Sequence, residues 1–182
     1  MISHDKSRWP SCWGVMPFVH SGYVGIEIGV AAGESALNFL ASGCWMYLVD
    51  PFVRYAEEYQ TYNEWGAEND PEIGFNLLKI NLVGYEGRYK LLRMKSEDAV
   101  VLMPPVDFVY IDGNHYYEYV KRDIEMYWPK VKPGGYLMGH DYSSRGNLPE
   151  NVVRAVDEFV SREHLVLEDV PRKSECWVVK KP

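Results

Sequence analysis

The sequence of 182 residues has few cysteines and no long apolar run. Its three cysteines, Cys12, Cys44 and Cys176, are an odd number without metal-ligand spacing, which favours reduced thiols over a disulfide framework. The longest apolar runs, such as residues 100–105, are far shorter than the roughly 20 residues that cross a bilayer. The N-terminus has no apolar stretch typical of a secretory signal. These absences predict a cytoplasmic protein with no membrane partner.

Positive charge is also scarce. Lysine and arginine number 19 against 26 aspartates and glutamates, which leaves a formal net charge of −7 at pH 7. Non-specific binding to nucleic acid depends on lysine and arginine contacts with phosphates, so no nucleic acid partner is expected. With 47% hydrophobic and 25% charged residues, the composition is that of a globular protein. The length fits one domain, which we expect to span residues 1–182.

What the sequence does contain is a regular alternation of β-rich runs and amphipathic stretches. Strands are expected at residues 23–28, 45–50, 89–94, 106–111, 135–138, 165–167 and 176–179. Helices are expected near residues 34–40, 70–80, 117–127 and 152–159, with a short one that Ser96 opens as its cap. Asp70 is expected to cap the second helix, with Pro71 in its first turn. Such alternation is typical of a mostly parallel sheet covered by helices on both faces.

The last two strands break this rhythm. Only residues 168–175 separate them, and a parallel pair needs a connection of a dozen or more residues. The pair should therefore form an antiparallel hairpin at the edge of the sheet. The predicted fold is α/β, a doubly wound, Rossmann-like sheet of seven strands, mostly parallel, with an antiparallel C-terminal edge hairpin.

A glycine-containing turn follows the first strand, where such sheets bind ligands. The segment from Glu27 to Ser35 reads E-x-G-x-x-x-G, with Gly29 at the sharp turn and Gly33 just before the helix. A dinucleotide site prefers G-x-G-x-x-G, and Glu27 would repel a pyrophosphate but suits a ligand with an amine. Asp50 ends the second strand and is placed to accept hydrogen bonds from ribose hydroxyls. A plain strand-to-helix turn is the alternative interpretation.

These residues resemble a known family. Glu27-x-Gly29-x-x-x-Gly33 followed by Asp50 is similar to motifs I and II of class I S-adenosylmethionine-dependent methyltransferases. The resemblance is strongest over residues 106–142, which include Ile111-Asp112-Gly113-Asn114-His115, Lys132-Pro133-Gly134-Gly135 and Gly139-His140-Asp141-Tyr142. This string resembles the small bacterial O-methyltransferases whose relatives act on sugars, antibiotics and catechols.

The resemblance implies S-adenosyl-L-methionine as the cofactor. Gly29 and Gly33 would face its methionine and ribose portions, and Glu27 would support the loop or meet the amino group through water. Asp50 would bind the ribose, and Ser96 with Glu97 would lie near the adenine. The implied cofactor-binding residues are Glu27, Gly29, Gly33, Ser35, Asp50, Ser96, Glu97 and Asp112. For Ser96, helix capping alone is the alternative.

Methyl transfer to a hydroxyl needs an aligned acceptor and a base that removes its proton. The candidate catalytic residues are Asp112, His115 and Asp141, all expected at the carboxyl ends of the fourth and fifth strands. Of the five histidines, His115 is the candidate general base. Its alternative role is simple packing at the start of a helix.

The two acids also suggest a divalent metal such as Mg²⁺ or Mn²⁺, bound by Asp112, His140 and Asp141. The sequence departs here from the metal-dependent pattern, because His140 and Tyr142 stand where such relatives carry a third oxygen ligand. Imidazole suits Zn²⁺, Mn²⁺ or Fe²⁺ better than Mg²⁺. Loop-capping acids without a metal are the alternative.

Residues 51–69 form an aromatic insertion directly after Asp50. Phe52, Tyr55, Tyr59 and Tyr62 recur at helical spacing, which is typical of a packed helix face but also suits a lid over an acceptor. Residues 1–20 form only a short N-terminal cap. Cover for the substrate would then come from the insertion or from another subunit, which leaves a homo-oligomer open.

The leading functional prediction is transfer of a methyl group from S-adenosylmethionine to a hydroxyl of a small molecule such as a sugar, a natural product or a catechol-like compound. Metal assistance is part of this hypothesis. A nicotinamide-dependent oxidoreductase on the same fold is the alternative enzyme, disfavoured by the missing third glycine. A cofactor-binding module without catalysis is the alternative outside enzymes.

Overall fold

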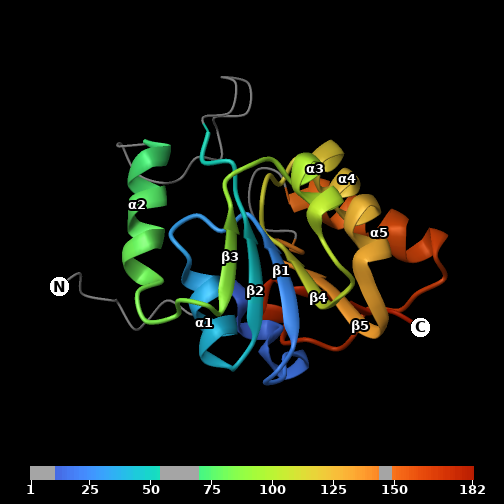
Figure 1. Cartoon of the computed structure of the whole chain (residues 1–182). Helices are drawn as coiled ribbons and strands as arrows, with labels where there is room; N and C mark the ends of the chain where they lie inside the picture. Colours follow the sequence, from blue (N-terminus) through green and yellow to red (C-terminus); the bar gives the residue numbers. More distant parts are fainter. Residues whose placement is uncertain (1–10, 54–69, 144–148) are drawn as a thin grey trace.

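The computed structural model describes residues 11–53, 70–143 and 149–182, and its centre is one twisted sheet (Figure 1). Six strands are present among these residues, in the spatial order β3-β2-β1-β4-β5-β6. They span β1 Val24–Ile28, β2 Trp45–Val49, β3 Tyr89–Leu92, β4 Val106–Ile111, β5 Val131–Gly139 and β6 Trp177–Lys180. All neighbours pair in parallel except β5 and β6, which are antiparallel. The doubly wound, mostly parallel sheet with an antiparallel edge is confirmed.

The seventh expected strand, at residues 165–167, is not a strand. It is reduced to a single antiparallel bridge between Leu167 and Val179. Leu167 pairs with β6 on the side away from β5. The connection that follows forms a 3-10 helix at Arg172–Ser174, so the pairing does not extend. The antiparallel edge is therefore made by β6 against β5 rather than by a long hairpin.

The fifth strand is longer than expected. β5 begins at Val131 and contains the segment 132–134 that its sequence marks as a turn. The ladder with β4 is irregular there, since Val106 pairs with Val131 but Phe108 pairs with Tyr136. Proline has no N–H to donate, and Gly134 has a φ of 78°, so the chain bulges without ending the strand.

Helices cover both faces of the sheet (Figure 1). One face carries α1 Glu34–Ala41 and α2 Pro71–Asn81, together with the 3-10 helices η1 Ser11–Gly14 and η2 Met16–Phe18. The other face carries α3 Ser96–Ala99, α4 Tyr117–Tyr127 and α5 Pro149–Arg162, with short 3-10 turns at Val100–Leu102 and Trp128–Lys130. No helix among the described residues is long and apolar enough to cross a bilayer.

Two apolar cores result, one on each side of the sheet. Alternate residues of a strand point to opposite faces, so Ile26 and Ile28 join the core under α4 and α5. Met46, Leu48 and Tyr110 join the core under α1 and η1. The parallel strands β1 to β5 end at the same edge of this sheet, and the loops that leave this edge carry the predicted site.

The second helix begins as predicted. The side chain of Asp70 accepts a hydrogen bond from the backbone N–H of Glu72 at 3.0 Å, and Pro71 is the first helical residue. The third helix begins at Ser96 as expected, but the prediction that Ser96 caps it is wrong. Lys95 stands at the cap position and makes no capping hydrogen bond through its side chain. Ser96 is itself the first helical residue, and its hydroxyl donates to Asp123 instead.

Candidate active site

The loop between β1 and α1 turns on two glycines in left-handed conformations. Gly29 has a φ of 84°, and a Cβ there would lie 2.2 Å from the carbonyl oxygen of Asp112. Gly33 has a φ of 88°, and a Cβ there would lie 2.5 Å from Cδ1 of Leu78 on α2. Gly29 is therefore required for the close approach of β1 and β4, and Gly33 for the packing of the loop against α2.

Asp50 follows β2 and faces this loop. One carboxylate oxygen accepts from the backbone N–H groups of Val30 and Ala31, both at 3.0 Å, and the other accepts from Phe52 at 2.8 Å. A carboxylate accepts about four hydrogen bonds, so three backbone partners leave acceptor capacity for a ligand hydroxyl. Asp50 thus shapes the glycine loop and stays at the edge where the ribose is expected.

Glu27 lies on β1 directly beneath the loop and is 1% exposed. Neither of its carboxylate oxygens has a hydrogen-bond partner among the described residues. Burial, with smaller contributions from the charges of Asp112 and Asp50, raises the pKa of Glu27 well above its usual value. A buried acid without a partner is costly unless a cation faces it. Its position therefore fits a cofactor that carries an ammonium and a sulfonium group.

The residues expected near the adenine lie on α3. The Ser96 hydroxyl donates to Asp123 of α4 at 2.5 Å, and Glu97 pairs with the Arg122 guanidinium at 2.9 Å. Burial raises the pKa of Asp123 to about 6, and the hydrogen bond from Ser96 opposes this rise. The start of α3 is thus held against α4 by a partly buried hydrogen bond and a surface ion pair.

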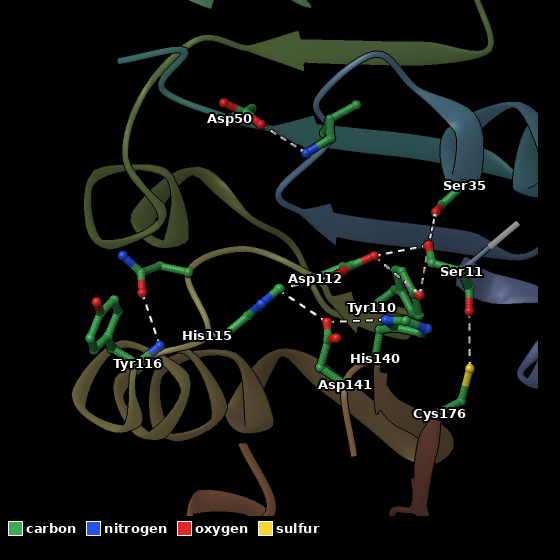
Figure 2. Close-up of polar contacts among 12 residues, drawn as sticks. Ser11, Ser35, Asp50, Tyr110, Asp112, His115, Tyr116, His140, Asp141 and Cys176 are labelled. Carbon is green, nitrogen blue, oxygen red and sulfur yellow. Dashed lines mark hydrogen bonds and ion pairs between the residues drawn. The ribbon is translucent and has the colours of Figure 1, made fainter. Parts of the chain in front are cut away.

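The catalytic candidates come together where β4 and β5 end (Figure 2). Asp112 follows β4 and Asp141 follows β5, while His115 lies in the loop before α4. The His115 Nε2 lies 3.1 Å from Asp141 Oδ2 and 3.6 Å from Asp112 Oδ1. Asp141 has a φ of 58°, a conformation uncommon outside glycine and often found at functional sites. The imidazole of His115 is therefore held between two carboxylates.

This arrangement sets the charge of the cluster. Burial opposes the charged form of His115, yet the nearby carboxylates of Asp112 and Asp141 outweigh it and raise the pKa of the imidazole. Burial also opposes the charge of Asp141, but the hydrogen bond with His140 and the charges of both histidines lower the pKa of that carboxyl. The two acids thus make His115 a stronger base than a solvent-exposed histidine.

The three expected metal ligands do not form one group. Asp112, His115 and Asp141 can each offer one ligand atom, all within 4.8 Å of one another. His140 is not in this group but stands beside it, with its Nδ1 3.0 Å from Asp141 Oδ2. His115 takes the place that the sequence suggested for His140.

Sequence reasoning missed two hydroxyls behind Asp112. The Ser11 hydroxyl donates to Asp112 Oδ2 at 2.9 Å and lies 2.9 Å from the hydroxyl of Ser35 (Figure 2). The Tyr110 hydroxyl lies 3.4 Å from the same carboxylate oxygen. Nothing in the sequence around Ser11 marks it, since it precedes the first strand and belongs to no motif. Tyr110 reads as an ordinary strand residue.

A small pocket lies beside the histidines. Its lining combines polar groups from the loops after β4 and β5 with apolar side chains of the helices and β6. The lining residues are Ile111, Gly113, Asn114, His115, Val120, His140, Val152 and Trp177. Since His115 lines it, the pocket adjoins the catalytic candidates.

Most of the aromatic insertion lies outside the described residues, including Tyr55, Tyr59, Tyr62 and Trp65. Phe52 is described and is buried. Its ring meets Phe75 of α2 at a centroid distance of 5.1 Å, and the Arg93 guanidinium lies 4.4 Å from the centre of the Phe75 ring. At this one position the aromatic side chain packs rather than facing the site.

Comparison with known proteins decides the family. A family model described as a methyltransferase domain matches residues 26–142, which include the glycine loop, Asp50 and the acid–histidine cluster. The chain belongs to this methyltransferase family. The mimivirus protein R132 of Acanthamoeba polyphaga mimivirus is 30% identical over 100 residues. That match covers 52% of this methyltransferase and 44% of R132, so the chain aligns with less than half of that relative.

Solved structures share the methyltransferase fold at low sequence identity. A putative caffeoyl-CoA O-methyltransferase from Staphylococcus aureus superimposes with a TM-score of 0.62 at 14% identity, over 87% of this chain and 76% of its own. The putative methyltransferase SMU.1697c from Streptococcus mutans, in complex with SAH, gives 0.62 at 11% identity, over 91% and 92%. A putative rRNA methylase from Clostridium thermocellum gives 0.64 at 12% identity, over 91% and 92%.

Proposed function

We propose that this methyltransferase transfers a methyl group from S-adenosylmethionine to a hydroxyl group of a small molecule, such as a sugar, a natural product or a catechol-like compound. The observation that carries the proposal is the position of His115, whose Nε2 lies between the carboxylates of Asp112 and Asp141 at the edge next to the glycine loop. An alcohol is a poor nucleophile at neutral pH, and a base in this position removes its proton.

The cofactor supplies an electrophilic methyl group on a positively charged sulfur. Glu27 would face its positive charge, Asp50 would accept from ribose hydroxyls, and Ser35 with the backbone of residues 29–33 would hold the methionine end. Glu97, fixed by Arg122, would lie near the adenine. These roles follow from the buried unpaired acid and from the resemblance of the loop to motif I.

Because Nε2 must carry a proton to donate to the two carboxylates, His115 would act as the base through Nδ1. This nitrogen would take the hydroxyl proton as the oxygen forms its bond to the methyl carbon and the carbon–sulfur bond breaks. Asp112 and Asp141 stabilise the imidazolium that results. A positioned base contributes about 10²–10⁴-fold, and alignment of the two reactants roughly 7–11 kcal/mol. The described residues thus supply orientation and proton transfer, which is what an oxygen acceptor requires.

The same three side chains support a second arrangement, because each offers a ligand atom within 4.8 Å of the others. In it, Asp112, His115 and Asp141 would bind a divalent cation that orients the acceptor and lowers the pKa of its hydroxyl. A donor set of one imidazole and two carboxylates suits Mn²⁺ or Zn²⁺ better than Mg²⁺. A chelator separates the two arrangements, since it abolishes transfer only where His115 is a ligand.

Binding measurements test the cofactor first. Titration calorimetry with S-adenosylhomocysteine, NAD and NADP should show binding of S-adenosylhomocysteine alone. NAD binding without it would favour an oxidoreductase and overturn the proposal.

A transfer assay tests the acceptor. Labelled S-adenosylmethionine is offered with panels of hydroxylated small molecules and, separately, with RNA. We expect label in a small molecule, in keeping with the acidic composition of the chain. Label in RNA alone would refute the acceptor class. If the protein binds S-adenosylhomocysteine but transfers no label, a cofactor-binding module without catalysis is favoured. The same assay is run on His115→Ala, with His164→Ala as the matched control.

A further inference from the structure

The N-terminal 3-10 helix η1 reaches into the acid–histidine cluster through one side chain. The Ser11 hydroxyl lies 2.9 Å from Asp112 Oδ2, to which it donates, and 2.9 Å from the Ser35 hydroxyl at the start of α1 (Figure 2). Ser11 therefore joins three elements that are far apart in the chain, namely η1, α1 and the loop after β4. No motif and no family match covers this residue, because the family model begins at residue 26.

The contacts around Asp112 divide its two oxygens between two tasks. Oδ2 receives the Ser11 hydroxyl and lies 3.4 Å from the Tyr110 hydroxyl, while Oδ1 faces His115 Nε2 at 3.6 Å. A carboxylate is free to rotate about its Cβ–Cγ bond unless hydrogen bonds hold one oxygen. The short contact from Ser11 fixes Oδ2, and this turns Oδ1 toward the imidazole.

Ser11 is itself held in place from the opposite side. The Cys176 thiol lies 3.1 Å from the Ser11 carbonyl oxygen, and η1 packs so closely on the turn before β6 that a Cβ on Gly14 would lie 2.1 Å from Ser174 Oγ. Its backbone is thus anchored to the C-terminal part of the chain independently of Asp112. A hydroxyl on an anchored backbone can impose a direction on its partner.

We propose that Ser11 is a positioning residue for methyl transfer: it orients the Asp112 carboxylate toward His115. This rests on the proposed function, in which Asp112 and His115 act on the acceptor. Residues that orient a ligand or base from behind typically change metal affinity or activity by about 10–100-fold when removed. The hydroxyl, rather than the bulk of Ser11, carries the effect.

The test compares Ser11→Ala, Ser11→Thr and Ser11→Val with Ser42→Ala. Ser42 is a matched control, because its hydroxyl donates to a backbone carbonyl at the far end of α1. The readout is the long-range ¹H–¹⁵N spectrum of the histidine imidazoles in the free protein. We expect the His115 signals to move in Ser11→Ala and Ser11→Val, to return in Ser11→Thr, and to stay in place in Ser42→Ala. The exposed His20 reports any global change.

Two results would overturn the proposal. His115 signals that do not change in a folded Ser11→Ala show that Asp112 keeps its orientation without the hydroxyl. Equal changes in Ser11→Thr and Ser11→Val, which have the same shape, show that packing rather than hydrogen bonding matters. If Ser11→Ala does not fold, the comparison of Thr with Val decides alone, and Tyr110→Phe, which removes the longer hydroxyl contact, gives a smaller shift in the same signals.

A binding arm keeps this inference apart from the proposed function. The affinity for S-adenosylhomocysteine should change by less than about threefold in Ser11→Ala. Unchanged His115 signals together with weaker S-adenosylhomocysteine binding would contradict the proposal. They would show that Ser11 acts through its contact with Ser35 and supports the cofactor loop instead. A wild-type protein that binds no S-adenosylhomocysteine refutes the proposed function, while the imidazole signals still report on Ser11 and Asp112.

Discussion

Asp123 makes stability depend on pH in the direction opposite to that of most aspartates. It is 4% exposed on α4 and accepts from Ser96, and burial raises its pKa from 3.8 to about 6. Because the pKa is higher in the folded than in the unfolded protein, ionisation costs folding free energy above pH 6. That cost disappears as the pH falls through 6 toward 4, where the acid is protonated in the folded state.

The magnitude follows from the shift. One pKa unit corresponds to 1.36 kcal/mol, so a shift of roughly two units makes ionised Asp123 cost about 3 kcal/mol at pH 7. In Asp123→Asn the amide oxygen still accepts from Ser96 but no charge is buried. Relative to wild type, Asp123→Asn should therefore gain about 2 to 3 kcal/mol of unfolding free energy between pH 4 and pH 7, since a small part of the cost is already present at pH 4. This difference is independent of any constant packing change that the substitution introduces.

Urea denaturation of both proteins at a series of pH values between 4 and 7.5 measures this free-energy difference. The dependence of the unfolding free energy on urea concentration should be the same for the two proteins. In Ser96→Ala the hydrogen bond that opposes the rise is lost, so the stability of that variant should depend on pH more steeply than wild type. A free-energy difference between Asp123→Asn and wild type that stays constant from pH 4 to pH 7 would refute the reasoning.

Three further predictions concern the site and its loops. His115→Ala should lower kcat for methyl transfer by about 10²–10⁴-fold while the Kd for S-adenosylhomocysteine stays near wild type. A variant that binds S-adenosylhomocysteine more weakly but keeps its kcat would contradict a role as base. Gly29→Ala should abolish S-adenosylhomocysteine binding and lower the melting temperature, since its Cβ would meet the Asp112 carbonyl at 2.2 Å in a left-handed conformation; unchanged calorimetry would contradict this. Asp70→Ala should cost about 1 kcal/mol of unfolding free energy through loss of the helix cap, without affecting binding, and equal denaturation curves would show that the cap contributes nothing.

The elements that sequence predicts well are those with strong local patterns. The strand at Trp45–Val49 is a continuous apolar run, and the helix at Pro71 carries a cap and a proline, so both are found where expected. The short segment at residues 165–167 looks like a strand, but whether it pairs depends on the neighbours that the fold gives it. Local pattern cannot supply that information.

The site divides in the same way. Asp112, His115 and Asp141 are predicted together because each follows an expected strand, and parallel strands end at one edge. The choice between His115 and His140 as the third member of the cluster depends on side-chain direction, which spacing does not determine. Ser11 is brought to Asp112 only by packing between distant segments, and Asp123 looks like a surface acid until the burial of α4 is known.

The contact between Ser11 and Cys176 has a consequence for how the protein is made. These two residues are 165 positions apart, and they join the part of the described chain synthesised first to a part synthesised near its end. Contacts between residues this far apart in sequence form late, because the entropy cost of closing the intervening loop comes before any stabilisation by the contact. The glycine loop and the first strands can assemble while the chain is still growing, but η1 can be seated only once β6 has emerged and paired with β5. Completion of the catalytic edge should thus follow the pairing of β6 with β5, and chains that have not yet reached β6 would carry the cofactor loop without a finished acid–histidine cluster.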